Sequence, residues 1–164
     1  MTTLPILTTA RLRLRPWRPD DDDDVAAFHA FQGDPRVIWW GHARDLAASR
    51  AALINRAHSD EPPLLGAWAI EQEGDVVGNA LLVRTELGVE IGWHMRRNVQ
   101  GRGIATEAAT ALLAHASRGG VDVVSAAIVP VNVPSVRVAE KLGFVVDGDL
   151  TRGGLFHERW RKRL

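Results

Sequence analysis

The fold is decided by a short stretch of the chain that reads Gln100-Gly101-Arg102-Gly103-Ile104-Ala105-Thr106-Glu107. An alternating apolar and polar run at 88–95 precedes it, and an Ala-rich segment at 104–117 follows it. This pattern predicts a strand, a glycine-bearing turn and a helix in succession. The unpaired N–H groups and the positive dipole end at the start of such a helix bind a phosphate, and glycine lets the ligand approach the backbone closely.

Two familiar phosphate-binding motifs are excluded at this turn. The stretch lacks the Gly-Lys-Ser/Thr ending of a P-loop. The glycine spacing also differs from the dinucleotide-binding G-x-G-x-x-G, because position 106 is a threonine. A glycine turn is equally compatible with a purely structural role, so the motifs elsewhere in the chain decide between the two interpretations.

The rest of the chain shows strand and helix patterns around this central unit. Strands are expected where apolar residues alternate or run together, at 11–17, 64–70, 76–83, 88–95, 121–129, around Phe144 and at 156–161. Helices are expected from the acidic run 20–24 to Gln32 and at 43–58, 104–117 and 134–142. This order predicts an α/β (α+β) fold, with a mixed and mostly antiparallel central sheet of about seven strands flanked by about four helices.

Composition excludes several classes of chemistry. With 164 residues, the chain is expected to form a single domain over 1–164. It contains no Cys and no Tyr, which rules out a disulfide framework, a thiolate metal site, an acyl-cysteine intermediate and a phenolic general acid. The 20 basic and 20 acidic side chains cancel, which argues against a nucleic-acid partner. No His/Asp/Glu grouping has metal-ligand spacing, so no metal is expected.

The sequence carries no targeting pattern that we recognise. Residues 1–10 lack the basic and apolar segments of a secretory signal, and no apolar run is long enough to cross a membrane. A cytoplasmic protein without a membrane partner is therefore expected.

The motif Gln100-x-x-Gly103-x-Ala105 resembles the acyl-coenzyme A pyrophosphate motif of the GNAT N-acetyltransferase superfamily. The fuller pattern is similar to the RimJ/RimL-type branch, which acetylates the N-termini of ribosomal proteins. It consists of Glu90-Ile91-Gly92-Trp93, the stretch 100–108, Asn132-x-x-Ser135, Glu140-Lys141-Leu142-Gly143-Phe144 and the opening Thr9-Ala10-Arg11-Leu12-Arg13-Leu14-Arg15. The resemblance covers nearly the whole chain except 39–63.

The resemblance implies a GNAT fold whose central sheet is splayed to hold acyl-CoA. It implies acetyl-CoA as the cosubstrate, bound through the backbone amides of the glycine turn, along the strand at 91–95 and by Asn132. Arg97 and Arg102 are also interpretable as solvated loop residues, and Asn132 as a helix N-cap. The implied cofactor-binding residues are Ile91, Trp93, Met95, Arg97, Gln100, Gly101, Arg102, Gly103, Ile104, Ala105, Thr106, Asn132 and Ser135.

The resemblance also implies direct transfer of the acetyl group to an amine in a ternary complex. Most GNAT sequences place a Tyr acid seven residues after the motif Asn, where this chain has Ala139. The hypothesis is therefore that Ser135 stabilises or protonates the thiolate, with a helix-surface serine as the alternative. Glu90 and His94 share a strand face and are the candidate general bases. Alternatively, Glu90 pairs with an Arg of a neighbouring strand, and solvent or the amine itself accounts for deprotonation.

The acceptor is not decided by the sequence. The branch resemblance favours a protein N-terminal α-amine, while a polyamine, an aminoglycoside or another small amine stays open. A non-catalytic acyl-CoA-binding sensor is the alternative from a different class. Trp39, Trp40 and His42 either wall the acceptor cleft or belong to the core. A homodimer formed through sheet edges, as in many relatives, is compatible with the sequence but is not specified by it.

Overall fold

A single sheet organises the molecule in the computed structural model, which describes residues 3–37, 43–58 and 61–164. Its strand order is β1-β2-β3-β4-β5-β6-β8-β7. All neighbouring strands pair antiparallel except β5 and β6, which are parallel. The strands are β1 (Leu7–Thr8), β2 (Arg13–Pro16), β3 (Gly66–Gln72), β4 (Asp75–Thr85), β5 (Gly88–Met95), β6 (Val123–Ile128), β7 (Val145–Arg152) and β8 (Leu155–Arg163).

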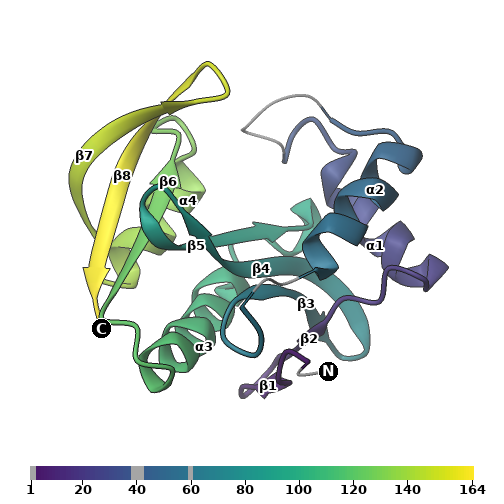
Figure 1. Cartoon of the computed structure of the whole chain (residues 1–164). Coiled ribbons are helices and arrows are strands. Elements are labelled where there is room, and N and C mark those ends of the chain that lie inside the picture. Colours follow the sequence, from purple (N-terminus) through teal and green to yellow (C-terminus); the bar gives the residue numbers. More distant parts are fainter. Residues whose placement is uncertain (1–2, 38–42, 59–60) are drawn as a thin grey trace.

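Helices cover both faces of this sheet (Figure 1). On one face, α1 (Asp22–Gln32) and α2 (Leu46–Ala57) pack through Phe28, Phe31 and Leu53. On the other face, α3 (Ile104–Arg118) and α4 (Val133–Lys141) bury an apolar cluster that includes Trp68 and Leu112. A short 3-10 turn, η1 (Arg97–Val99), lies between β5 and the glycine turn. The sheet is therefore held between two apolar clusters, one on each of its faces.

The structure confirms the predicted fold class and its four helices but adds a strand. The strand expected at 11–17 begins at Arg13, and an unpredicted strand at Leu7–Thr8 precedes it, with a turn between them in which the Thr9 N–H donates to the Leu12 carbonyl over 2.9 Å. This turn pairs β1 with β2, so the sheet has eight strands in the described parts of the chain. The second helix begins at Leu46 rather than near 43, because the Asp45 side chain caps it by accepting from the Ala48 N–H.

No helix within the described residues is both long enough and apolar enough to span a bilayer.

A buried ion-pair network fastens α1 to the edge of the sheet. The alternation of arginines in β2 predicts an exposed Arg15, but that side chain is only 6% exposed. Two hydrogen bonds of 2.7 and 2.6 Å join it to Asp24, and a third of 2.6 Å joins it to Glu71. Burial raises the pKa of Asp24, but the hydrogen bonds from Arg15 and Arg18 outweigh burial and hold that pKa below its usual range.

Removal of the Asp24 carboxylate should therefore destabilise the protein strongly. We expect Asp24→Ala to lower the free energy of unfolding by about 3–5 kcal/mol, because it leaves the Arg15 charge buried with only part of its pairing. The matched control is Asp23→Ala, an exposed carboxylate in the same first helical turn, with an expected loss within about 1 kcal/mol. Denaturant unfolding of both variants measures the difference, and equal losses would contradict the role given to Asp24.

Candidate active site

The central feature of the site is the divergence of β5 and β6. These parallel strands share one register position, Glu90 opposite Ser125, and then separate. The pocket between them, called the β5–β6 pocket below, has a volume of about 490 Å³ and is lined by residues 90–94 of β5 and by β6. The predicted splay is therefore confirmed. Past the junction, alternate N–H and C=O groups of β5 have no neighbouring strand to bond within the described structure.

A second cavity of about 360 Å³, called the α3 pocket below, adjoins the first. Its walls include the glycine turn, the first turn of α3 and one side of α4. Four residues line both cavities, so the two pockets meet at these residues. These residues are Trp93, His94, Asn132 and Ser135.

The glycine turn has the geometry of an anion cradle. Gly101 and Gly103 have φ values of 76° and 77°, which side chains rarely adopt. A Cβ at Gly101 would meet nothing within 4 Å, so the backbone there is open to a ligand. The first main-chain bond of α3 runs from the Glu107 N–H to the Gly103 carbonyl, which leaves the N–H groups of residues 104–106 without a helical partner. This helix end fits a pyrophosphate group.

Three basic side chains add positive charge to the α3 pocket, and sequence reasoning missed all of them. Arg36 comes from the segment after α1, whereas Arg137 and Lys141 come from α4. Of the two expected arginines, neither Arg97 nor Arg102 lines the pocket. Lys141 belongs to a motif quoted above but was given no role there, and no sequence signal singled out Arg36 or Arg137, because both approach the turn only when α1 and α4 pack against the sheet.

The remaining cofactor-binding candidates line one of the two pockets, and Gln100 also supports the glycine turn. Residues that line the α3 pocket as expected are Trp93, Met95, Gln100, Gly101, Gly103, Ile104, Ala105, Thr106, Asn132 and Ser135. Ile91 lines the β5–β6 pocket instead. Gln100 also donates its side-chain N–H to the Met95 carbonyl over 3.2 Å and so braces the turn against β5.

Glu107 ties the glycine turn to the start of the chain. Its carboxylate accepts from Thr9 Oγ1 at 2.6 Å, from the Arg11 N–H at 3.0 Å and from Arg11 Nε at 2.7 Å. Arg11 Nη1 also donates to the Arg102 carbonyl in the turn. The opening motif and the turn motif, which are far apart in the sequence, are therefore one structural unit.

Ser135 stands at the junction of the two pockets, in the first turn of α4. The Asn132 side chain caps this helix by accepting from the Ser135 N–H over 3.4 Å, which confirms the N-cap interpretation of Asn132. Ala139, where a Tyr would stand in most of the family, is fully buried one turn further along. Ser135 is half-buried and lines both cavities.

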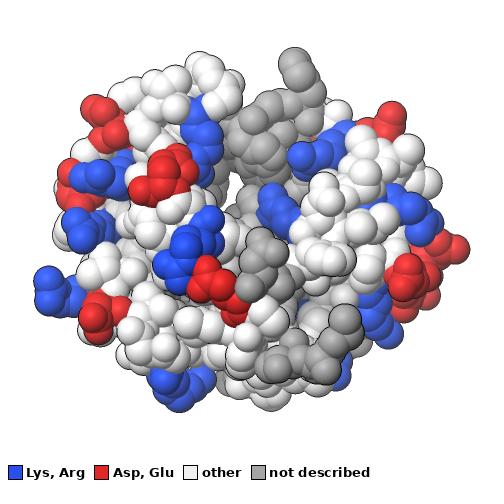
Figure 2. Space-filling model, viewed as in Figure 1, with Lys and Arg blue, Asp and Glu red and all other residues white. Residues whose placement is uncertain are grey.

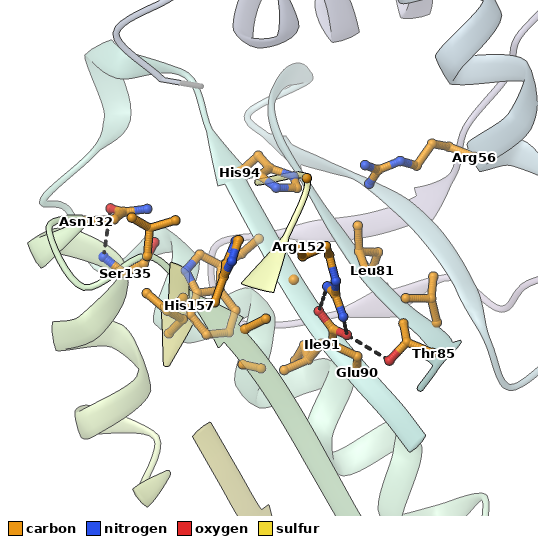
Figure 3. A pocket seen from close by; sticks show the side chains of 18 residues that line it. Arg56, Leu81, Thr85, Glu90, Ile91, His94, Asn132, Ser135, Arg152 and His157 are labelled. Atoms are coloured by element: carbon orange, nitrogen blue, oxygen red, sulfur yellow. Dashed lines mark hydrogen bonds and ion pairs between the residues drawn. The ribbon is translucent and has the colours of Figure 1, made fainter. Parts of the chain in front are cut away.

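Glu90 is engaged in an ion pair rather than left as an available base. Its carboxylate accepts from both terminal nitrogens of Arg152, each at 2.9 Å, and from Thr85 Oγ1 at 2.9 Å (Figure 3). Pairing of Glu90 with an arginine is confirmed, but the expectation of a neighbouring strand is wrong, because Arg152 belongs to β7, which does not lie beside β5. Arg152 also bonds Glu86 at 2.9 Å. The pair fastens the β7–β8 hairpin over the β5–β6 pocket.

His94 shares the Glu90 face as predicted, and its hydrogen bonds determine its tautomer. The Trp17 indole, which only donates, bonds Asn79 Oδ1 at 2.8 Å, so the Asn79 amide nitrogen faces His94 Nδ1 at 3.2 Å. Nδ1 therefore accepts, and the neutral ring carries its proton on Nε2. Burial, with the charges of Arg56 and Arg44, lowers the pKa of His94 to about 3. A group of this pKa is a weak base at neutral pH.

Sequence reasoning missed two further residues of the β5–β6 pocket. His157, on β8, is buried, and its Nδ1 lies 2.9 Å from the Leu155 carbonyl. A carbonyl only accepts, so Nδ1 carries the proton and Nε2 carries the lone pair. Arg56, in the last turn of α2, places a buried Nη1 that has no hydrogen-bond partner among the described residues. Trp39, Trp40 and His42 lie outside the described residues.

The hollow is visible on the molecular surface. Figure 2 shows it between the β6–β8 side of the molecule and the α1–α2 side, with Lys or Arg side chains at its rim. Acidic and basic side chains are otherwise interspersed on this face (Figure 2). Among the residues described, no three His, Asp or Glu side chains gather in a way that could hold a metal ion.

Comparison with known proteins agrees with this geometry. The family model described as an acetyltransferase (GNAT) domain matches residues 11–145. The chain is 29% identical over 142 residues to an L-methionine sulfoximine/L-methionine sulfone acetyltransferase of Pseudomonas aeruginosa, covering 83% of this chain and 81% of the relative.

Solved structures share the fold over essentially the whole chain. An acetyltransferase from Agrobacterium tumefaciens superimposes with a TM-score of 0.84 at 26% identity, covering 100% of this chain and 97% of that one. RimJ of Mycobacterium smegmatis, solved in complex with CoA-disulfide, gives a TM-score of 0.77 at 22% identity, covering 99% of this chain and 87% of that one.

A splayed sheet with an anion cradle at one helix end and a second pocket beyond it defines an acyl-CoA-dependent transferase. The chain belongs to the GNAT acetyltransferase family. It is an acetyl-CoA-dependent N-acetyltransferase.

The pKa of His94 has a consequence for stability. Below the unfolded-state pKa of about 6.5, the unfolded chain binds a proton that folded His94 does not, so the free energy of unfolding falls as pH falls toward 3. When the pH is lowered from 7 to 5, the free energy of unfolding of His94→Gln should fall by about 2 kcal/mol less than that of the wild type. The control is His58→Gln, an exposed histidine just after α2. Denaturant unfolding at both pH values tests this, and an unchanged pH dependence in His94→Gln would contradict it.

Proposed function

We propose that this protein acetylates the primary amine of a small acceptor that binds in the β5–β6 pocket. The observation that carries the proposal is the meeting of this pocket with the α3 pocket at Ser135. An acetyl group delivered from the α3 side would reach that junction, and an amine held in the β5–β6 pocket would reach it from the other side. The name of the Pseudomonas aeruginosa relative, which acetylates amino-acid derivatives, supports a small acceptor.

Binding of the cosubstrate uses mainly the backbone in this proposal. The N–H groups of residues 104–106 and the glycine turn hold the pyrophosphate, and Arg137 and Lys141 add charge. The open edge of β5 pairs with the pantetheine arm, as an added strand would. Asn132 contributes through its amide nitrogen, because its Oδ1 already caps α4.

Ser135 acts on the leaving group in this proposal. Bound acetyl-CoA supplies a thioester, whose carbonyl carbon forms a bond to the amine nitrogen while the C–S bond breaks. The Ser135 hydroxyl donates a hydrogen bond to the departing thiolate sulfur; where its proton passes to sulfur, the serine oxygen regains a proton from solvent. Its position in the first turn of α4, fixed by the Asn132 cap, holds this hydroxyl at the pocket junction.

His157 is the general base that the geometry favours. Glu90 is engaged by Arg152 and Thr85, and the Nδ1 of His94 already accepts a hydrogen bond. His157 keeps its Nδ1 proton on a backbone carbonyl, so Nε2 offers a lone pair to the proton of the acceptor amine. The sequence favoured Glu90 and His94, and both stay as competing hypotheses in the experiment below.

Loss of the Ser135 hydroxyl should slow the chemical step. We expect Ser135→Ala to lower kcat by about 10- to 100-fold with little change in CoA affinity, because only the hydrogen bond to the developing thiolate is lost. Thiol release measures the rate without background, since the chain has no Cys. Ser135→Thr, which keeps a hydroxyl, and Ser117→Ala on the exposed part of α3 are the controls. Full turnover in Ser135→Ala would refute this role.

CoA binding without thiol release for any amine would instead favour a sensor.

The base is identified by pH–rate profiles. We expect His157→Gln to lose the acidic limb of the kcat/KM profile and to approach the wild-type rate as pH rises toward the pKa of the amine, because the amine then deprotonates itself. Glu90→Gln and His94→Gln should keep that limb. A limb that disappears in one of these variants and persists in His157→Gln would assign the base to that residue instead.

A further inference from the structure

The end of the β5–β6 pocket that lies against α2 contains a positive charge that pairs with no carboxylate among the described residues. Arg56 reaches into the pocket from the last turn of α2. Its Nη1 is buried and makes no hydrogen bond with any described residue. Burial, followed by the charge of Arg44, lowers the pKa of Arg56, and no carboxylate in the described parts of the chain raises it. Arg56 is half-buried, and a buried guanidinium nitrogen that bonds no described group costs folding free energy.

Other charged groups near the pocket do not supply the missing anion. Glu90 is the one acidic residue among the described residues that line the pocket, and Arg152 pairs with it through two bonds. Arg44 shares the α2 side with Arg56 and bonds the neutral side chain of Gln32. His94, which faces both arginines, stays neutral with its proton on Nε2. This end of the pocket therefore offers donors and positive charge.

The position of Arg56 indicates which part of an acceptor it would meet. Figure 3 shows Ser135 and Arg56 on opposite sides of the pocket, with His157, Arg152 and His94 between them. An acceptor whose amine lies at Ser135 and His157 would extend toward Arg56 with its other end. Guanidinium groups bind carboxylates in a bidentate geometry, which gives orientation as well as affinity.

We propose that the acceptor carries a carboxylate in addition to its amine, and that Arg56 binds this carboxylate and sets the specificity. The proposal rests on the proposed acetylation of a small amine and names its substrate class. A polyamine would bring further positive charge against Arg56. An amino acid or a related amino carboxylate brings the missing anion and leaves its amine for the transfer.

The experiment compares acceptors that differ in the carboxylate alone. The panel holds L-methionine sulfone, glycine, β-alanine and 4-aminobutanoate, each beside its carboxamide, together with spermidine and a short peptide. Thiol release from acetyl-CoA gives kcat/KM for each. We expect wild-type protein to favour the best carboxylate over its carboxamide by about tenfold or more. Arg56→Met should reduce this ratio to near one, and Arg56→Lys should give an intermediate ratio because it keeps the charge without the bidentate geometry.

A matched control lies on the same helix. Arg50, also on α2, pairs with Asp22 at the surface and does not line the pocket, so Arg50→Met should keep the wild-type ratio. Titration with CoA checks that each variant retains a folded cosubstrate site.

Each outcome decides between defined conclusions. A wild-type ratio near one, or a ratio unchanged in Arg56→Met, overturns the carboxylate inference and leaves amine acetylation standing. Preference for spermidine or for the peptide also overturns it. Absence of thiol release with every amine, while CoA binds, overturns the proposed function itself and the inference with it.

Discussion

The structure depends on the divergence of two parallel strands. β5 and β6 pair at Glu90 and Ser125 and then separate, so the middle of the sheet is open where an intact sheet would be closed by ladder hydrogen bonds. Neighbouring groups hold the closed end of this opening, since Ser125 Oγ donates to the Leu87 carbonyl over 3.3 Å and Glu90 holds Arg152. These bonds fix the point at which β5 and β6 separate. Side chains of α3, α4 and the β7–β8 hairpin surround the opening beyond that point.

Charge pairing explains which polar residues of this protein are structural. Arg15 and Arg152 are enclosed by carboxylates, and the bonds from Asp24 and from Glu90 respectively are the leading reason that the pKa of each guanidinium is raised. Both arginines therefore act as clamps, one for α1 and one for the hairpin. Arg56 differs because no carboxylate reaches it within the described structure. Arg15 and Arg152 therefore stabilise the fold, whereas Arg56 is the arginine that we propose binds a ligand.

Much of the fold and of the geometry of the glycine turn was predictable, for local reasons. The glycine turn, the first turn of α3, and the Asn132 cap before Ser135 depend on residues within a few positions of one another, so their spacing carries the information. The general base that we propose was harder to predict. Alternation in β5 placed Glu90 and His94 on one face correctly, but it could not show that Arg152 occupies the first or that Asn79 and Trp17 fix the proton of the second. His157, the base proposed here, gave no signal, because its place in the pocket depends on a hydrogen bond to Leu155 and on the β7–β8 hairpin.

The sequence by itself determined the order of the helices and of every strand except β1, the glycine turn before α3 and the absence of cysteine and tyrosine chemistry, since these follow from local patterning and residue identity. Tertiary structure decided which side chains from distant segments meet. Arg56 from α2, Arg152 from β7 and His157 from β8 enter one pocket because the sheet opens between β5 and β6 and the two helix pairs pack on opposite faces. Long-range packing and charge pairing, which no single stretch of sequence encodes, therefore decide which side chains line the β5–β6 pocket.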